Sequence, residues 1–558
     1  FWDNRDRKLY LDGRVEGTVN DLDAEDMFIA LENRRLVARG DLRTRDLTYP
    51  DFRTINLQLD ELRTNMTALR QLFPKFRPPE AFDRLGWLDF SGRFDVLFSD
   101  YIAYGTLSSA LGKAEMDMKV RNLSGNRAEA SYSGSLSLVD FDLGQFTQND
   151  DLGLVNFSSS VRNGKGLTAE TATADLSAEV ESFIYKGYNY RNAQLTGLLK
   201  KNEFSGDFMI QDEYIDFQFN GQVDMTDSVP KFNFYASVNK VAMQPLNLTE
   251  KDITLSGDVG LDLKNSTLSE LEGSGRLQDV VILHRNKDTI SVDSVVFSSF
   301  FEPGGRKRFG IQSDLMEGSL LGQFDIEGVG PALMDYLQRN HTAFFNRLGL
   351  KPPQRAPKSN AFVYDLRVKD TKGILALFDP KLGPIVQTSL EGYFDNTKDS
   401  IFIHLQMPRF RYGNIALNNV GLYSRLRDSV GSINFRVEEP VLNDKRRLAP
   451  VHVLADLDHD TLDIGLAYQA EGLSVLDNIN LNAQLYLLDS LNYQLRFRQS
   501  NLVILQKIWE IEPENLITFR KGFIDTEHFR MRHRDQELRL QSVGEKGLKL
   551  FLANLDFS

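Results

Sequence analysis

The chain has 558 residues, of which 41% are hydrophobic and 26% charged, proportions that exclude a disordered protein. Its net charge of −13 argues against nucleic-acid binding, which requires basic stripes. Cysteine is absent, which excludes zinc–thiolate sites, iron–sulfur clusters, thiol catalysis and disulfides. A chain of this size without cysteine suits a compartment that oxidises thiols, such as a periplasm.

No apolar run approaches the ~18–20 residues that span a bilayer, and no signal peptide opens the chain. The opening FWDNRDRK resembles an interior cut, so we expect a membrane anchor upstream of it.

A glycine followed by alternating apolar and polar residues recurs along the chain. Side chains of a strand alternate between its two faces, so each run predicts a strand, opened by a glycine that permits a turn, a bulge or close backbone approach. The irregular spacing indicates a degenerate array, with a minor break at Met66–Leu72 and Phe73–Phe82. The runs begin at Gly13, Gly92, Gly134, Gly206, Gly221, Gly257, Gly275 and Gly318.

The alternation is clearest in IDFQFNGQVDM, from Ile215 to Met225. One parity is apolar and the other polar, which predicts a strand with one apolar face and one hydrated face. The apolar parity holds Ile215, Phe217, Phe219, Val223 and Met225, and the polar parity holds Asp216, Gln218, Asn220, Gln222 and Asp224. The pattern returns at 232–238, 253–263, 362–368, 401–407 and 479–487.

Turn-forming residues separate the runs, at Asn163-Gly164, Pro303-Gly304-Gly305 and Asn396–Asp399. We therefore predict an all-β fold, an elongated and curved antiparallel sheet forming a repeating, solenoid-like β-groove with few short helices. Strands should take more than half of the chain. At about 4.8 Å per strand, an assumed forty or so strands would extend on the order of 190 Å, which approaches the width of a periplasm.

The strongest predicted helix runs from Pro331, in its first turn, to Leu348, with Gly349 just past its end. Such a helix could lie on a membrane surface or cover the apolar face as a lid. The favoured interpretation is that it packs on the sheet and closes one section of it. Shorter helices are predicted at 371–378 and 501–510. The proline-rich segment 351–360 sets the predicted boundary between domains 1–350 and 351–558, both built of β-groove repeats.

The search for chemistry finds no strong motif. The densest polar cluster, DLDHDTLD, carries Asp456, Asp458, His459, Asp460 and Asp463 but lacks EF-hand spacing, so a hairpin with Leu457 and Leu462 turned inward is favoured over a cation site. The GVGPAL segment at 328–333 lacks the third glycine of a dinucleotide fingerprint, and neither a Walker A motif nor a nucleophile elbow occurs. Paired carboxylates fall on polar faces, so we expect no enzyme, no cofactor and no metal site.

A sheet with one apolar face must bury that face against something. The predicted helices are too few to cover it. In the chain as a whole, phenylalanine (38 residues) far exceeds tryptophan (3 residues). An incompletely closed sheet leaves a long apolar groove, and exposed apolar surface on that scale is typical of a site for acyl chains. The candidate lining residues are Ile215, Phe217, Phe219, Val223, Met225, Val259, Leu261 and Leu263.

The run Phe183–Met225, FIYKGYNYRNAQLTGLLKKNEFSGDFMIQDEYIDFQFNGQVDM, resembles the repeat of the TamB family of translocation and assembly module subunits, within the AsmA-like group. Other segments resemble the Bacteroidetes-type members of this family. They are Leu11–Leu31, Leu85–Phe94, Tyr104–Met118 and Tyr132–Phe146, with a weaker resemblance at Phe410–Leu426. The resemblance is dense from about residue 11 to residue 265 and thin afterwards.

This resemblance implies an internal fragment of a periplasmic protein, anchored to the inner membrane through an N-terminal segment that this chain lacks. The implied function is non-enzymatic: bridging the inner and outer membranes for phospholipid transport, for outer-membrane protein translocation and assembly, or for both. The implied partners are phospholipid acyl chains and an outer-membrane barrel like BamA or TamA. The main alternative is a structural or adhesive β-solenoid with a filled core. A third interpretation is a carbohydrate-active β-helix, which requires an exposed cleft with paired carboxylates and stacked aromatic side chains.

Overall fold

The computed structural model describes residues 8–31, 35–49, 51–72, 80–98, 100–122, 128–166, 168, 170–265, 270–285, 288–347, 349–353, 358–443, 445–459, 461–469, 476–488, 492–520, 523–544 and 547–555. The opening residues 1–7, on which the expectation of an upstream anchor rests, lie outside this set.

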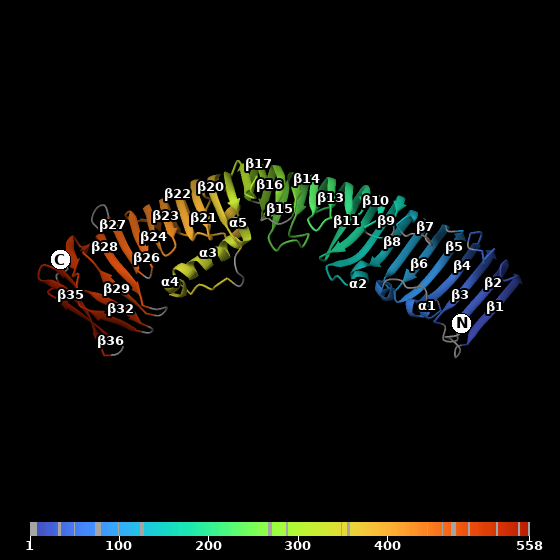
Figure 1. The fold of residues 1–558 in the computed structure, drawn as a ribbon, viewed down its shortest axis with the longest axis horizontal. Coiled ribbons are helices and arrows are strands. Elements are labelled where there is room, and N and C mark those ends of the chain that lie inside the picture. The colour runs from blue at the N-terminus through green and yellow to red at the C-terminus, as the bar shows by residue number, and fades with distance from the viewer. Residues whose placement is uncertain are drawn as a thin grey trace. The chain divides into compact units, whose positions relative to one another are not determined.

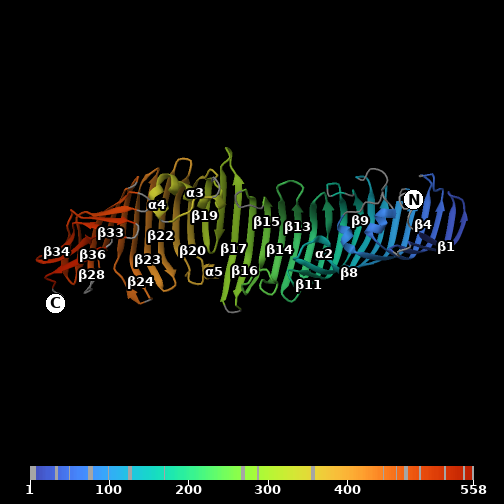
Figure 2. The ribbon, with the colours of Figure 1, turned by 90° about the horizontal axis from the view of Figure 1, so that it is seen from below.

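The described residues form one antiparallel sheet of 36 strands that is not closed (Figures 1 and 2). Strands make up 69% of the described residues and helices 8%, which confirms the predicted all-β class with few short helices. The chain divides into two compact units, residues 1–264 with 277–291 and residues 265–276 with 292–558.

In the first unit every strand from β1 to β15 pairs with the next strand along the chain. Its elements are β1 (Leu9–Gly17), β2 (Leu22–Leu31), β3 (Val37–Arg45), β4 (Thr54–Asn65), α1 (Met66–Leu72), η2 (Glu80–Leu85), β5 (Trp87–Leu97), β6 (Asp100–Ser109), β7 (Gly112–Arg121), β8 (Ser131–Asp142), α2 (Leu143–Thr147), β9 (Leu152–Lys165), β10 (Thr173–Tyr185), β11 (Tyr188–Lys200), β12 (Glu203–Gln211), β13 (Ile215–Asp224), β14 (Lys231–Ala242) and β15 (Ile253–Lys264). Strands β16 (Glu272–His284) and β17 (Asp288–Phe301) contribute residues to both units.

The second unit continues the same antiparallel pairing. Its elements are β18 (Lys307–Ser313), β19 (Met316–Gln323), α3 (Ile326–Asn340), α4 (Thr342–Arg347), β20 (Ala361–Asp370), α5 (Ile374–Phe378), β21 (Val386–Asp395), β22 (Ser400–Tyr412), β23 (Ile415–Arg427), β24 (Val430–Leu442), β25 (Arg446–Arg447), β26 (Val451–Asp458), β27 (Thr461–Gln469), β28 (Leu476–Leu487), β29 (Tyr493–Phe497), β30 (Ser500–Ile504), β31 (Lys507–Ile511), β32 (Leu516–Arg520), β33 (Phe523–Glu527), β34 (Phe529–His533), β35 (Gln536–Val543) and β36 (Gly547–Ala553).

The segment proposed as a domain linker connects neighbouring strands. Strand β19 precedes it and β20 follows it, and the two pair directly from Gln323 opposite Ala361 to Met316 opposite Val368. The sheet therefore continues directly from β19 to β20, and the domain boundary placed at residues 351–360 stays a prediction.

The sheet forks at β28. Residues 483–487 of this strand pair with β29, whereas residues 476–480 pair with β30. One branch continues through β32 to β33, and the other through β31, β34 and β35 to β36. Ile511, Ile517 and Phe529 from both branches meet in one apolar cluster, and the Thr526 N–H of β33 donates to Ser542 Oγ of β35 at 2.7 Å. Here the sheet covers its own apolar face, which the sequence pattern did not predict.

Register keeps the apolar parities of successive strands on one face. Phe219 of β13 lies opposite Phe208 of β12 and Ala236 of β14, while Gln218 lies opposite Met209 and Ser237. The same match holds further back in the first unit, where Phe94 of β5 lies opposite Leu57 and Ala103. Because a slip of one residue would move every side chain to the other face, the apolar pattern and the hydrogen-bond register specify each other.

The recurrent glycines lie inside strands and not at their starts, which corrects the prediction. Gly92 of β5 and Gly105 of β6 lie directly opposite each other, with φ of 157° and 158°. A Cβ on either residue would lie well inside van der Waals contact with a carbonyl oxygen of the neighbouring strand. Gly221 of β13 has a φ of 153° and meets Asn233 in the same way. These are positions of close backbone approach that only glycine permits.

The helix predicted from Pro331 begins earlier than expected. Helix α3 starts at Ile326, so Pro331 lies inside it, and a second helix, α4, follows from Thr342 to Arg347. Two glycines in its first turns argue against helix, but packing on the sheet overrides this weak propensity. Gly349 has a φ of 66° just past α4, as expected for a residue that ends a helix.

Two local predictions are wrong. Residues 501–510 form strands β30 and β31, because a short apolar run fits a strand as well as a helix and here pairs with β28 and β34. Asn163-Gly164 is no turn but lies within β9, where Asn163 has a φ of 53° beside a shift in register with β10. The turns predicted at 303–305 and 396–399 are present, and the helix predicted at 371–378 is present from Ile374 to Phe378.

Replacing Gly221 with alanine is expected to lower the free energy of unfolding by about 1–3 kcal/mol, because a Cβ strains the backbone there and meets the carbonyl of Asn233. The matched control is Gly260→Ala on β15, where a Cβ would approach only Tyr235 Cδ2, at 4.0 Å. The control should change stability by less than about 0.5 kcal/mol. Urea unfolding measures both, and equal losses would contradict the close approach at Gly221.

Candidate functional site: the apolar face of the sheet

The face formed by β12 to β15 carries a continuous row of aromatic and aliphatic side chains. Phe219 packs against Phe234, with ring centroids 5.0 Å apart, and Phe208 packs against Phe217 at 6.2 Å. Val259 lies opposite Ala236, and Leu261 lies opposite Phe234. These contacts join four successive strands into one apolar surface.

Seven of the eight predicted lining residues share this face as half-buried side chains. They are Ile215, Phe217, Phe219, Val223, Val259, Leu261 and Leu263. Met225 does not join them, because β13 ends at Asp224 and Met225 is 51% exposed beyond it.

One border of the face is filled by the protein itself. Leu246, in the turn after β14, is fully buried against Tyr190, Ala193 and Ile210. The Tyr190 ring stacks on Phe183 with centroids 4.8 Å apart, and Ile215 and Phe217 pack against this cluster. Sequence reasoning missed Leu246 because it lies outside any alternating run. Its contacts divide the face into a covered border and a half-buried remainder around Phe219 and Leu261.

Helices cover the apolar face at two other places. In the first unit α1, η2 and α2 contribute Met66 and Leu85, with Leu143 and Phe146 nearby, to a cluster that includes Phe141 and Val155 of β8 and β9. In the second unit α3 covers the strands from β20 to β23. None of the helices within the described residues is long and apolar enough to cross a bilayer.

Helix α3 lies alongside the strands of the second unit (Figure 1), and its buried residues contact the apolar parity of β20 to β23. Ala332 and Tyr336 are fully buried against Phe394 of β21 and Ile401 of β22. The adjoining side chains are Leu333, Leu337, Phe362, Ile403 and Leu426. The helix therefore packs on the sheet and covers this section of the apolar face, as predicted.

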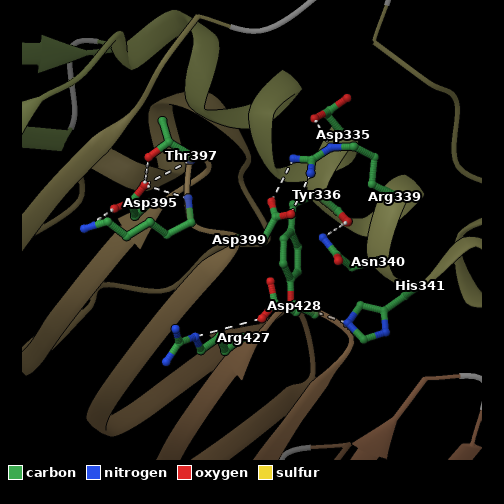
Figure 3. A network of polar contacts seen from close by, with 11 residues as sticks. Asp335, Tyr336, Arg339, Asn340, His341, Asp395, Thr397, Asp399, Arg427 and Asp428 are labelled. Atoms are coloured by element: carbon green, nitrogen blue, oxygen red, sulfur yellow. Dashed lines mark hydrogen bonds and ion pairs between the residues drawn. The ribbon is translucent and has the colours of Figure 1, made fainter.

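Polar contacts fix α3 to the strand ends (Figure 3). The Arg339 guanidinium donates to both carboxylate oxygens of Asp399, at 2.6 and 2.8 Å, and to Asp335 at 2.8 Å. The Tyr336 hydroxyl donates to the backbone carbonyl of Asp428 at 2.9 Å. Burial, with the charges of Asp399 and Asp428, raises the pKa of Tyr336 to about 12, so the phenol is neutral under physiological conditions.

The opposite face is hydrated and internally paired. Asn220 donates to Asp207 across β12 and β13 at 2.7 Å, and Lys231 bridges Asp224 and Asp227 at 3.3 and 2.8 Å. Hydrogen bonds from Thr226, with the charge of Lys231, lower the pKa of Asp224. Exposed pairs of this kind contribute little to stability, but they make this face hydrophilic.

The cluster from Asp456 to Asp463 is a hairpin. Leu457 and Leu462 face each other across β26 and β27, and His459, with a φ of 53°, occupies the turn. Asp460 lies outside the described residues. Within the described part of the chain, no group of three or more histidine, aspartate or glutamate side chains is arranged to hold a metal ion.

No protein-family model, curated protein or solved structure matches this chain. The resemblance to the TamB family therefore remains a prediction from the sequence motifs.

Replacing Phe219 with aspartate should destabilise the first unit by about 2–5 kcal/mol, because it removes an aromatic contact and places an unpaired carboxylate on the apolar face. Gln218→Asp, one residue away on the hydrated face, should stay within about 0.5 kcal/mol of the parent. Thermal and urea unfolding compare the two variants. A similar loss at both positions would show that the two faces are wrongly assigned.

Proposed function

We propose that this chain is a non-enzymatic protein of the cell envelope whose apolar face binds phospholipid acyl chains. The observation that carries the proposal is the half-buried row around Phe219, Val223 and Leu261, held in register across β12 to β15. The described helices pack elsewhere, against the cluster at β8 and β9 and against β20 to β23.

Acyl chains suit this surface for a physical reason. Each methylene removed from water contributes about 0.8 kcal/mol, so a few carbons per strand are enough to hold a chain. Successive strands offer similar apolar side chains at the strand spacing of ~4.8 Å, so a chain can move from one strand to the next without crossing a strongly preferred position. A series of weak, nearly equivalent contacts favours movement over tight retention.

The TamB-like motifs support a specific setting for this binding. In that setting the protein is periplasmic, anchored to the inner membrane, and bridges it to the outer membrane with a BamA- or TamA-like barrel as partner. The cargo would be phospholipid, outer-membrane protein, or both.

A structural or adhesive role is the second candidate. It is favoured by the fork after β28, where Ile511, Ile517 and Phe529 fill the space between two branches of the sheet. In a protein of that kind the protein's own side chains would fill the whole apolar face.

A photocrosslinking amino acid at Phe217 or Leu261 is expected to capture phospholipid in cells, whereas one at Gln218 or Asp262 should not. The first two side chains lie on the apolar face, and the other two are exposed on the hydrated face. Mass spectrometry of the crosslinked adducts identifies the lipid. If a folded protein yields no lipid adduct at any of the four positions, the structural role replaces the transport role.

A further inference from the structure

A second stretch of the apolar face lies beneath α3. Phe362 of β20 lies opposite Phe394 of β21, which lies opposite Ile401 of β22, which in turn lies opposite Leu426 of β23. This row matches the row on β12 to β15 in parity and in chemistry. It differs because α3 occupies it, with Ala332 and Tyr336 fully buried.

The chain topology allows α3 to leave without disturbing the sheet. The helix belongs to an excursion between β19 and β20, two strands that pair directly up to Gln323 and Ala361. The ends of the excursion are joined by a hydrogen bond from the Asp325 N–H to Asn360 Oδ1, at 2.8 Å. Everything between these residues is an insertion, so its movement breaks no hydrogen bond of the ladder.

The helix is weak in itself, and one of the polar contacts that hold it is a partly exposed ion pair. Gly328, Gly330 and Pro331 in its first half disfavour an isolated helix. Its far end is held by Arg339, whose side chain is 45% exposed, through the paired contact to Asp399 of the β21–β22 turn, and by Tyr336 (Figure 3). Water therefore reaches the Arg339–Asp399 contact, while the apolar contacts beneath the helix are dry.

We propose that the face of β20 to β23 beneath α3 is a second acyl-chain site, and that α3 is its lid. An acyl chain and the apolar side of α3 compete for the same surface around Phe394 and Ile401. Opening breaks the Arg339–Asp399 contact and the hydrogen bond from Tyr336 to Asp428, and it lifts α3, with the joined ends near Asp325 and Asn360 as the hinge. This inference rests on the proposed function, since it assumes that the apolar face binds lipid.

The absence of cysteine makes a direct test possible, because the double variant Arg339→Cys/Asp399→Cys carries the only two thiols. Left reduced, this variant lacks the ion pair, and its lid is released. Joined by a short bifunctional thiol reagent, the same protein has its lid tethered. The probe is a phospholipid with a photoreactive acyl chain in vesicles of zwitterionic phospholipid, and peptide mass spectrometry locates the labels.

The released form should be labelled on β20–β23 as well as on β13–β15, whereas the tethered form should be labelled on β13–β15 alone. Equal labelling of β20–β23 in both forms, or labelling of β13–β15 only in both, overturns the lid and leaves the proposed function standing. If neither region is labelled, the proposed function fails, and the second acyl-chain site fails with it.

Hydrogen exchange tests the lid without lipid. Amides of α3 should exchange before those of β21 and β22, and Arg339→Gln should speed their exchange roughly ten-fold. The matched control is Arg367→Gln on β20. This change removes an exposed ion pair with Asp365 on the hydrated face, where the two side chains lie 3.6 Å apart, and it should leave the exchange rates of the α3 amides unchanged. If α3 exchanges only together with the strands beneath it, the helix is a fixed part of the core and not a lid.

Discussion

The structure depends on the in-register antiparallel ladder, which forces the apolar parity of every strand onto the same face. A strand that places Phe219 on that face must place Gln218 on the other, and its neighbours follow through cross-strand pairs such as Phe208–Phe219. The sheet thereby accumulates an apolar surface that no single strand can bury. The turns, the helices and the fork after β28 each cover part of that surface, and other parts stay half-buried.

Three kinds of cover occur among the described residues. Turns close the borders of the face, as Leu246 does beside Tyr190. Helices cover sections, as α3 does through Ala332 and Tyr336. The fork after β28 brings two branches together around Ile517. The row on β12 to β15 stays half-buried. We therefore propose this row, and not the covered sections, as the lipid-binding surface.

The sequence predicted what periodicity controls and missed what depends on contacts distant in the chain. Alternation was enough to assign β13 and the face of Phe217, because the parity of a strand is a local property. Residues 501–510 were mistaken for a helix, since only pairing with β28 and β34 decides the conformation of a short apolar run. Asn163-Gly164 was mistaken for a turn, because a bulge uses the same residues as a turn.

In the candidate site, too, the sequence predicts the features that depend on local periodicity and misses those that depend on contacts distant in the chain. Parity was enough to place seven of the eight candidate residues on one face of the sheet. Met225 does not share it, because the end of β13 is set by its pairing and not by its composition. Arg339 and Asp399 carry no sequence pattern, since they lie 60 residues apart and meet only when α3 docks on the sheet.

Mass spectrometry of the lipids that copurify with the chain tests the central claim most directly. The account predicts that phospholipid copurifies from cells with the folded protein, because the apolar row on β12 to β15 is only half-buried by the protein itself. A protein that is folded by circular dichroism and carries no lipid after gentle purification would contradict it.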